Sequence, residues 1–179
     1  PTPMFTPFDL RGLAVPNRVA MAPMAQYCAE GGDLTDWHFS HYAARAVGGA
    51  GLVFTEMTCP TPDARITDAC TGLWSDRQEA GWKRLVDFIH ETTPSKVALQ
   101  LCHAGRKGST RTPADGEDLT MASGNWPLYS ASPIPYIDGV SDIPAEMTRA
   151  DMDRVIADFV ASTIRGARAG FAMIALHCA

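Results

Sequence analysis

The chain has 179 residues, of which 46% are hydrophobic and 20% are charged, and its formal net charge is -5 at pH 7. This composition is typical of a globular protein, and the length is sufficient for one domain with a substantial core. The net negative charge argues against nonspecific binding to nucleic acid or to an anionic membrane surface. No apolar run approaches the roughly 20 residues that a membrane-spanning helix needs, so we expect no membrane association.

The cysteines and the N-terminal residues indicate the cellular setting. Five cysteines are present, an odd number, and no two have Cys-x-x-Cys spacing. This pattern disfavours a disulfide scaffold or a compact zinc site, and we predict no metal. Residues 1–7 lack the basic start and apolar core of a signal peptide, although a first residue of Pro leaves a removed segment open. We therefore expect a reducing, cytoplasmic setting.

The N-terminal part of the chain predicts a hairpin, a strand, a helix and a second strand, at residues 11–17, 18–24, 36–47 and 50–58. The first strand ends at Pro23, since proline cannot continue a central ladder. Thr35 can cap the helix, and Gly48 can end it.

A second helix and a third strand follow. Ser75 and Gln78 form a capping box, and apolar residues at helical spacing then continue to Pro94, which ends the helix. The strand from Lys96 to Leu101 is an almost unbroken apolar run, as expected when both faces are covered.

Gln100 interrupts this third strand with a polar side chain. A buried amide costs free energy unless its two donors and its acceptor find partners. A backbone partner in the core and the edge of a bound ligand would both satisfy it. For a lone glutamine in an apolar strand, the core partner is the more common outcome.

A long segment rich in Gly, Pro and Ser covers residues 108–146. Loops of this length inside a compact domain are uncommon and usually functional. Thr148 and Asp151 then form a capping box for a third helix, Gly170 ends it, and residues 171–176 form a fourth strand.

The alternation of strands and helices implies a parallel sheet with right-handed crossovers. No Gly-x-Gly-x-x-Gly follows the first strand and no phosphate-loop lysine motif is present, which disfavours a nucleotide-binding doubly wound sheet. In parallel barrels the chemistry lies where the strands end. Those ends carry residues 23–27, 56–58 and 100–103, and His177.

The four strand ends together resemble the Old Yellow Enzyme family, flavin-dependent ene-reductases built on an eight-stranded barrel. The specific part of the likeness is Gln100 to Lys107, Gln-Leu-Cys-His-Ala-Gly-Arg-Lys, and weaker matches lie at residues 5–7, 16–18, 22–24, 51–53 and 169–171. The likeness covers essentially the whole chain. It implies that residues 1–179 are the N-terminal part of a single TIM (β/α)8 barrel domain, with four β/α units, an N-terminal hairpin and a long loop after the third strand.

The resemblance implies FMN bound across the strand ends, with NADH or NADPH as reductant. The residues expected to contact the flavin, in part through backbone groups, are Ala22, Pro23, Met24, Ala25, Met57 and Gln100. Gln100 would pair with the pyrimidine edge of the flavin, whose alternating donors and acceptors suit an amide. In this context the ligand interpretation of Gln100 is favoured over the core partner.

The resemblance also implies two catalytic residues. His177 would donate a hydrogen bond to the substrate carbonyl and favour the enolate-like charge that develops as hydride arrives, although a lone histidine at a strand end is more often structural. Tyr27 resembles a tyrosine that reaches the substrate in one branch of the family, and a packed aromatic ring is the alternative. The expected substrate is a small molecule with an activated C=C bond, an enone or an aromatic or unsaturated acyl-CoA. Residues 124–127 and 146–148 are most similar to the reductase part of bifunctional aromatic acyl-CoA monooxygenase/reductases.

Several parts of the family pattern would lie beyond Ala179: strands five to eight, the phosphate-binding loops, a second histidine or asparagine, and a tyrosine proton donor. A half-barrel has two open sheet edges, which favour association or a homo-oligomer. The second hypothesis is therefore a non-catalytic half-barrel that self-associates or needs a complementary half. We expect the inward face of the sheet to carry Val19, Met21, Val53, Leu99 and Ile174.

Overall fold

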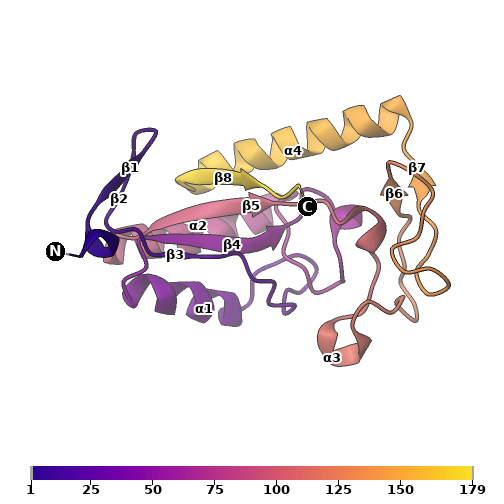
Figure 1. Ribbon diagram of the computed structural model, residues 1–179, viewed down its shortest axis with the longest axis horizontal. Coiled ribbons are helices and arrows are strands. Elements are labelled where there is room, and N and C mark those ends of the chain that lie inside the picture. Colours follow the sequence, from indigo (N-terminus) through magenta and orange to yellow (C-terminus); the bar gives the residue numbers. More distant parts are fainter. Residues whose placement is uncertain (1, 179) are drawn as a thin grey trace.

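The computed structural model describes residues 2–178 as an α/β domain built on a four-stranded parallel sheet (Figure 1). The strands are β3 (Ala20–Met21), β4 (Leu52–Thr58), β5 (Lys96–Leu101) and β8 (Met173–Leu176), adjacent in that order. The helices α1 (Asp36–Val47), α2 (Asp76–Thr92) and α4 (Arg149–Ala169) connect them. The predicted parallel sheet with alternating helices is confirmed.

The N-terminal hairpin consists of β1 (Phe8–Leu10) and β2 (Leu13–Val15), paired antiparallel. Its turn is Arg11-Gly12, and both residues have positive φ, 52° and 85°, as a two-residue hairpin turn requires. Val15 packs in one cluster with Leu52 and Ala98, which places the hairpin at the amino ends of the strands.

The predicted capping boxes at Ser75 and Thr148 and the predicted helix end at Gly170 are confirmed. Ser75 accepts a hydrogen bond from the Gln78 backbone amide at 3.3 Å, and Thr148 forms the equivalent box with Asp151. Gly170 ends α4 with φ 91°, in the left-handed region. The first strand is shorter than predicted, two residues in place of 18–24. The remaining elements are short: η1 (Pro3–Phe5), η2 (Pro62–Ala64), η3 (Gly105–Lys107), α3 (Pro113–Gly116), β6 (Tyr129–Ser130) and β7 (Ala145–Glu146).

The core lies between the sheet and the helices, and it corrects one prediction. Met21, Val53, Leu99 and Ile174 pack there against helix residues such as Trp82, so the prediction that they face inward was wrong. Val19 is half-buried beside the hairpin. The opposite face carries Leu52, Phe54, Ala98 and Met173. Successive side chains of a strand point to opposite faces of the sheet. If one residue of a strand is assigned to the wrong face, all other residues of that strand are assigned to the wrong face as well.

The strand β4 contains a bulge that changes which side chains share a face. Phe54 pairs with Ala98, but the next pair is Met57 with Gln100. Two residues of β4, Thr55 and Glu56, therefore lie opposite the single residue Leu99. One extra residue shifts the alternation, so Glu56 contacts α1 while Met57 lies on the opposite face beside Gln100.

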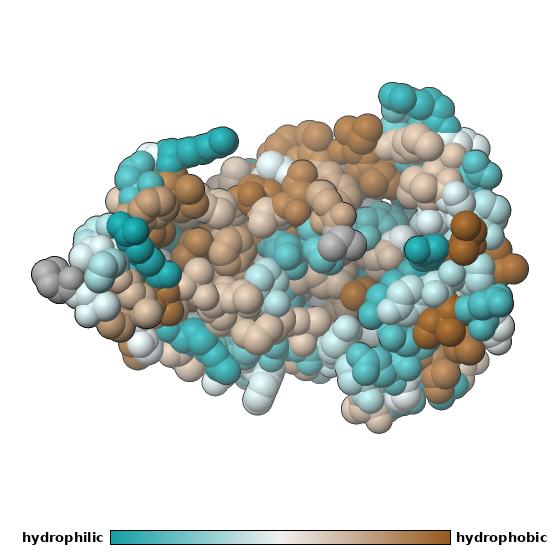
Figure 2. All heavy atoms as spheres, in the orientation of Figure 1, coloured by the Kyte–Doolittle hydropathy of each residue, from teal (hydrophilic) through white to brown (hydrophobic). Residues whose placement is uncertain are grey.

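An apolar face of α4 lies open beside β8. A groove of about 430 Å³ runs along it, lined by Val155, Ile156, Phe159, Val160, Thr163, Ile164 and Leu176. Ile156 and Leu176 are 58% and 60% exposed. Figure 2 shows hydrophobic residues gathered over α4 and β8. No helix among the described residues combines the length and apolar composition needed to cross a bilayer.

We expect the 179-residue chain, expressed by itself, to self-associate through this α4 face. Burying each large apolar side chain stabilises by roughly 1.5–3 kcal/mol, so the pair Ile156→Lys and Ile164→Lys should weaken association by roughly tenfold or more. Sedimentation velocity over a concentration series measures this. Val47→Lys, at a residue 68% exposed on α1, is the matched control and should change nothing. An unmodified chain that stays monomeric throughout the series would contradict the expectation.

Candidate functional site

The carboxyl ends of the four strands surround a hollow of about 280 Å³. Its lining residues are Pro23, Ala25, Met57, Ile66, Gln100 and His177. They come from the segments that end or follow β3, β4, β5 and β8. All but Ile66 are residues that the sequence predicted as cofactor or substrate contacts, so the fold brings most of the predicted site together.

Gln100 presents its amide to this hollow. Its backbone N–H donates to the Thr55 hydroxyl at 3.0 Å, which anchors the strand at the bulge. Within residues 2–178 its side-chain amide has no hydrogen-bond partner, and the residue is only half-buried. The alternative, a backbone partner in the core, is thus absent from the described residues, and the amide's donors and acceptor remain free for a ligand.

The segment after β3 divides into residues that line the hollow and residues that do not. Pro23 and Ala25 line it, whereas Ala22 and Met24 are exposed and do not. Tyr27 lies outside the lining. Its half-buried ring packs against the cluster of Met57, Cys59, Ala64, Cys70 and Cys102. Burial raises the pKa of Tyr27 above its ordinary value, so its hydroxyl remains protonated at neutral pH.

A second hollow of about 290 Å³ adjoins the first and shares Ile66 and His177 with it. Its other lining residues are Cys102, His103, Ala104, Arg106, Lys107 and Tyr136. The long loop contributes to this wall, because the ammonium of Lys107 lies 3.2 Å from Asp118 and 5.1 Å from the centre of the Tyr136 ring. Burial lowers the pKa of His103, which keeps its imidazole neutral.

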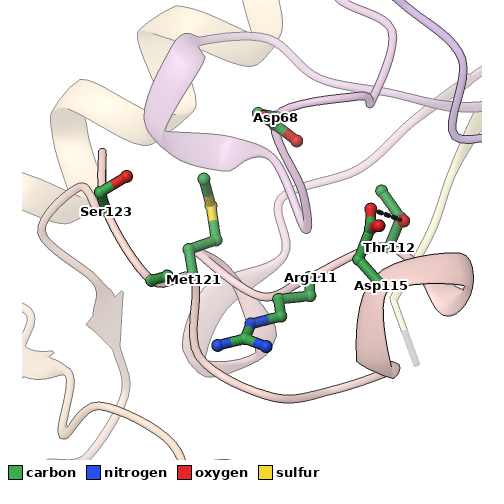
Figure 3. A pocket seen from close by; sticks show the side chains of 7 residues that line it. Asp68, Arg111, Thr112, Asp115, Met121 and Ser123 are labelled. Atoms are coloured by element: carbon green, nitrogen blue, oxygen red, sulfur yellow. Dashed lines mark hydrogen bonds between the residues drawn. The ribbon is translucent and has the colours of Figure 1, made fainter.

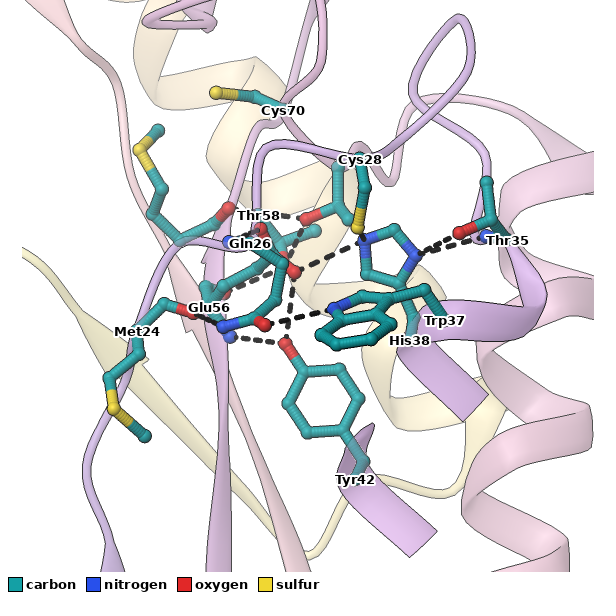
Figure 4. Close-up of polar contacts among 12 residues, drawn as sticks. Met24, Gln26, Cys28, Thr35, Trp37, His38, Tyr42, Glu56, Thr58 and Cys70 are labelled. Atoms are coloured by element: carbon teal, nitrogen blue, oxygen red, sulfur yellow. Dashed lines mark hydrogen bonds and ion pairs between the residues drawn. The ribbon is translucent and has the colours of Figure 1, made fainter. Parts of the chain in front are cut away.

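A buried polar network lies behind the segment after β3 (Figure 4). Glu56, 1% exposed, accepts hydrogen bonds from the backbone N–H of Gln26 and from the hydroxyl of Tyr42, at 2.9 and 3.1 Å. The Nε2 atom of His38 lies 3.2 Å from the same carboxylate. The sequence assigned none of these residues a role, although Gln26 and Glu56 lie in the strand ends at residues 23–27 and 56–58. The available signal was an acidic residue inside an apolar strand, which needs buried donors.

Three cysteines, Cys59, Cys70 and Cys102, lie beside Met57 in the hydrophobic cluster that packs against Tyr27. All five cysteines of the chain are free. A hydrogen bond from Cys59 lowers the pKa of the Cys70 thiol to about 7, whereas burial raises that of Cys59 well above its usual range. Among residues 2–178, no cluster of His, Cys, Asp and Glu has the arrangement of a metal site.

A further hollow of about 450 Å³ lies around the start of the long loop, outside the set of strand-end residues. It is lined by Asp68, Arg111, Thr112, Asp115, Met121, Ala122 and Ser123 (Figure 3). The Nε of Arg111 donates to the Thr120 carbonyl at 3.0 Å, and Thr112 donates to Asp115 at 2.7 Å. These bonds hold the loop together, and we assign the hollow no chemistry.

Comparison with known proteins gives consistent matches along the chain. The family described as NADH:flavin oxidoreductase / NADH oxidase matches residues 3–179. An NADH:flavin oxidoreductase of Gibberella zeae is 38% identical over 182 residues, which cover 99% of this chain and 44% of that protein. An NADPH dehydrogenase of Bacillus velezensis is 35% identical over 178 residues, with 98% and 48% covered. The chain therefore spans about half the length of the curated relatives it matches.

Solved structures agree with the fold. Morphinone reductase superposes with a TM-score of 0.81 at 28% identity, over 98% of this chain and 48% of that one. Old Yellow Enzyme from Pichia sp. AKU4542 superposes with a TM-score of 0.84 at 22% identity, over 98% and 46%. At that identity, the second match bears on the fold alone. The predicted fold, the N-terminal part of a TIM (β/α)8 barrel, is confirmed by these matches.

Proposed function

The chain belongs to the NADH:flavin oxidoreductase / NADH oxidase family, and we propose that it forms the N-terminal part of an FMN-dependent oxidoreductase. The proposed reaction transfers hydride from NADH or NADPH to the activated C=C bond of an enone or of an aromatic or unsaturated acyl-CoA. Relatives named NADPH dehydrogenase and a structure of morphinone reductase with tetrahydroNAD support a nicotinamide reductant. The observation that carries the proposal is the free amide of Gln100 at a hollow between strand ends.

The residues around that hollow fit a flavin ring. Pro23, Ala25 and Met57 provide largely apolar walls, and Gln100 provides one amide with two donors and an acceptor. A planar heterocycle with a polar edge matches this combination. Ala22 and Met24, whose side chains are exposed, would contact the ring through backbone groups. A bound flavin supplies the hydride chemistry, and the protein supplies position and electrostatics.

His177 is the proposed hydrogen-bond donor to the substrate. Its backbone N–H donates to the Leu101 carbonyl at 3.0 Å, which fixes the chain at the end of β8. Its side chain lies where the two hollows meet. From there its imidazole donates to the carbonyl oxygen of a substrate and stabilises the negative charge that develops on it. Tyr27 is the second proposed contact, since its protonated hydroxyl can donate and its ring packs beside Met57.

The alternative function is a non-catalytic half-barrel that self-associates or docks on a complementary half, and the open apolar face of α4 favours it. Absorption spectra of the purified 179-residue chain and of the complete protein together separate the two. We expect the chain alone to hold FMN poorly and to show no turnover, because the phosphate, the most charged part of FMN, would bind elsewhere in a complete barrel. The complete protein should be yellow. A monomeric chain that co-purifies with stoichiometric FMN and reduces an enone would contradict this expectation.

We expect Gln100→Ala, in the complete protein, to weaken FMN binding. The loss of hydrogen bonds to a ligand costs about 1–3 kcal/mol, which is roughly a 5- to 150-fold rise in the dissociation constant. Fluorescence titration of FMN measures it. Asn125→Ala removes an exposed amide that bonds Asp142 in the long loop, and it should leave the affinity unchanged. Equal affinity for Gln100→Ala and the unmodified protein would remove Gln100 from the proposed cofactor contacts.

We expect His177→Ala, in the complete protein, to slow reduction of an enone far more than it slows flavin reduction by the nicotinamide. Removing one donor to a developing oxyanion costs about 100-fold or more in rate, and only the substrate half-reaction uses this donor. Stopped-flow measurement of the two half-reactions separates them. His90→Gln, in α2 where the side chain accepts from the Val97 N–H, is the control. Equal slowing of both half-reactions by His177→Ala would rule out the assigned role.

A further inference from the structure

We propose that Glu56 is a positioning residue that, together with His38 and Tyr42, fixes the segment Met24–Cys28 beside the cofactor hollow. This inference rests on the proposed function, because it assigns these residues to the flavin-facing segment. It adds a layer of residues behind the ones that line the hollow.

Two groups donate hydrogen bonds to the Glu56 carboxylate, and the imidazole of His38 lies beside it. The Gln26 N–H reaches Oε2 at 2.9 Å, and the Tyr42 hydroxyl reaches Oε1 at 3.1 Å. The Thr35 N–H donates to Nδ1 of His38 at 3.0 Å, and the Nε2 atom lies 3.2 Å from Oε1 of Glu56 and 3.6 Å from Sγ of Cys28. A carboxylate accepts both bonds, whereas a protonated acid or an amide would oppose a donor with a donor at one of its two positions.

Tyr42 binds the Glu56 residue at two points. Its oxygen also accepts the Glu56 backbone N–H at 2.8 Å, so one hydroxyl satisfies both the bulged backbone and the carboxylate. Tyr42 is fully buried, and burial raises its pKa well above the ordinary value. The hydroxyl therefore remains protonated at neutral pH, and its two bonds restrain the orientation of Glu56.

The bond to Gln26 transmits this orientation to the hollow. Because a peptide unit is planar, fixing the Gln26 N–H also fixes the direction of the Ala25 carbonyl, and Ala25 lines the hollow. The Gln26 side chain continues the restraint: its amide donates to the Met24 carbonyl at 2.8 Å and accepts from Trp37 at 3.0 Å. The flavin-facing segment is thus held to helix α1 as well as to the sheet.

The backbone of Tyr27, the residue after Gln26, adopts a conformation that costs free energy. Tyr27 has φ 52°, in the left-handed region that residues with a Cβ rarely adopt. Such a conformation persists only where the surrounding structure determines it, and such positions cluster at functional sites. The fixed Gln26 N–H directly precedes Tyr27, so the Glu56 network is placed to hold this turn.

The test is Glu56→Gln in the complete protein, read by FMN affinity and by the absorption spectrum of bound FMN. The amide has the same shape but presents an N–H to one of the donors, so we expect a rise of about tenfold or more in the FMN dissociation constant and a shifted flavin band. Ser162→Ala is the control, since its buried hydroxyl bonds the Leu73 carbonyl away from this segment. It should lower the melting temperature without changing the affinity or spectrum. Wild-type affinity and spectrum in Glu56→Gln would overturn the proposal.

Tyr42→Phe keeps the ring packing and decides the matter if Glu56→Gln does not fold. Alone, it should raise the FMN dissociation constant several-fold. Where Glu56→Gln does fold, Tyr42→Phe should cost less in that background than alone, because the residues act as a unit. Strictly additive effects, or an unchanged affinity in Tyr42→Phe, would overturn the network. If the unmodified complete protein binds no FMN, the proposed function fails and this inference fails with it. If it binds FMN and the variants match it, only the inference fails.

Discussion

The bulge between Phe54 and Met57 in β4 is the constraint on which the site depends. A regular strand would place Met57 on the same face as Val53, inside the helix layer. One extra residue places Met57 beside Gln100 at the hollow and Glu56 against Tyr42. The same irregularity therefore produces both the wall of the site and the buried carboxylate that supports it. Bulges near functional sites commonly redirect a side chain in this way.

Burying a carboxylate costs free energy, which its hydrogen-bond donors must offset. A well-packed apolar residue at the same place is often as good or better for stability alone. Helix α1 contributes His38 and Tyr42, spaced four residues apart on one face, so a single helix orients the carboxylate. The result couples the N-terminal half of α1 to the backbone that borders the hollow. Stability and site geometry are thus linked through one helix.

Much of the fold was predictable from local signals. The capping boxes at Ser75 and Thr148 gave the starts of two helices, because they depend on residues three apart. Gln100 could be proposed as a ligand contact from the sequence, because an amide within an apolar strand needs hydrogen-bond partners. The bulge and the partners of Glu56 were not predictable, since they depend on register and on contacts between distant segments. Because the sequence does not give the register, the predicted face of Met21, Val53 and Leu99 was the opposite of the observed one.

The open face of α4 and β8 has a consequence for synthesis. In a protein of the relatives' length, this segment leaves the ribosome when about half of the chain is still to be made. At ordinary elongation rates the remainder takes on the order of ten seconds or more. During that interval Ile156, Val160 and Ile164 stand uncovered while the rest of the α/β layer can already pack. The nascent chain thus exposes an apolar surface on α4. A chaperone, or rapid docking of the following segment, would shield this surface from neighbouring chains.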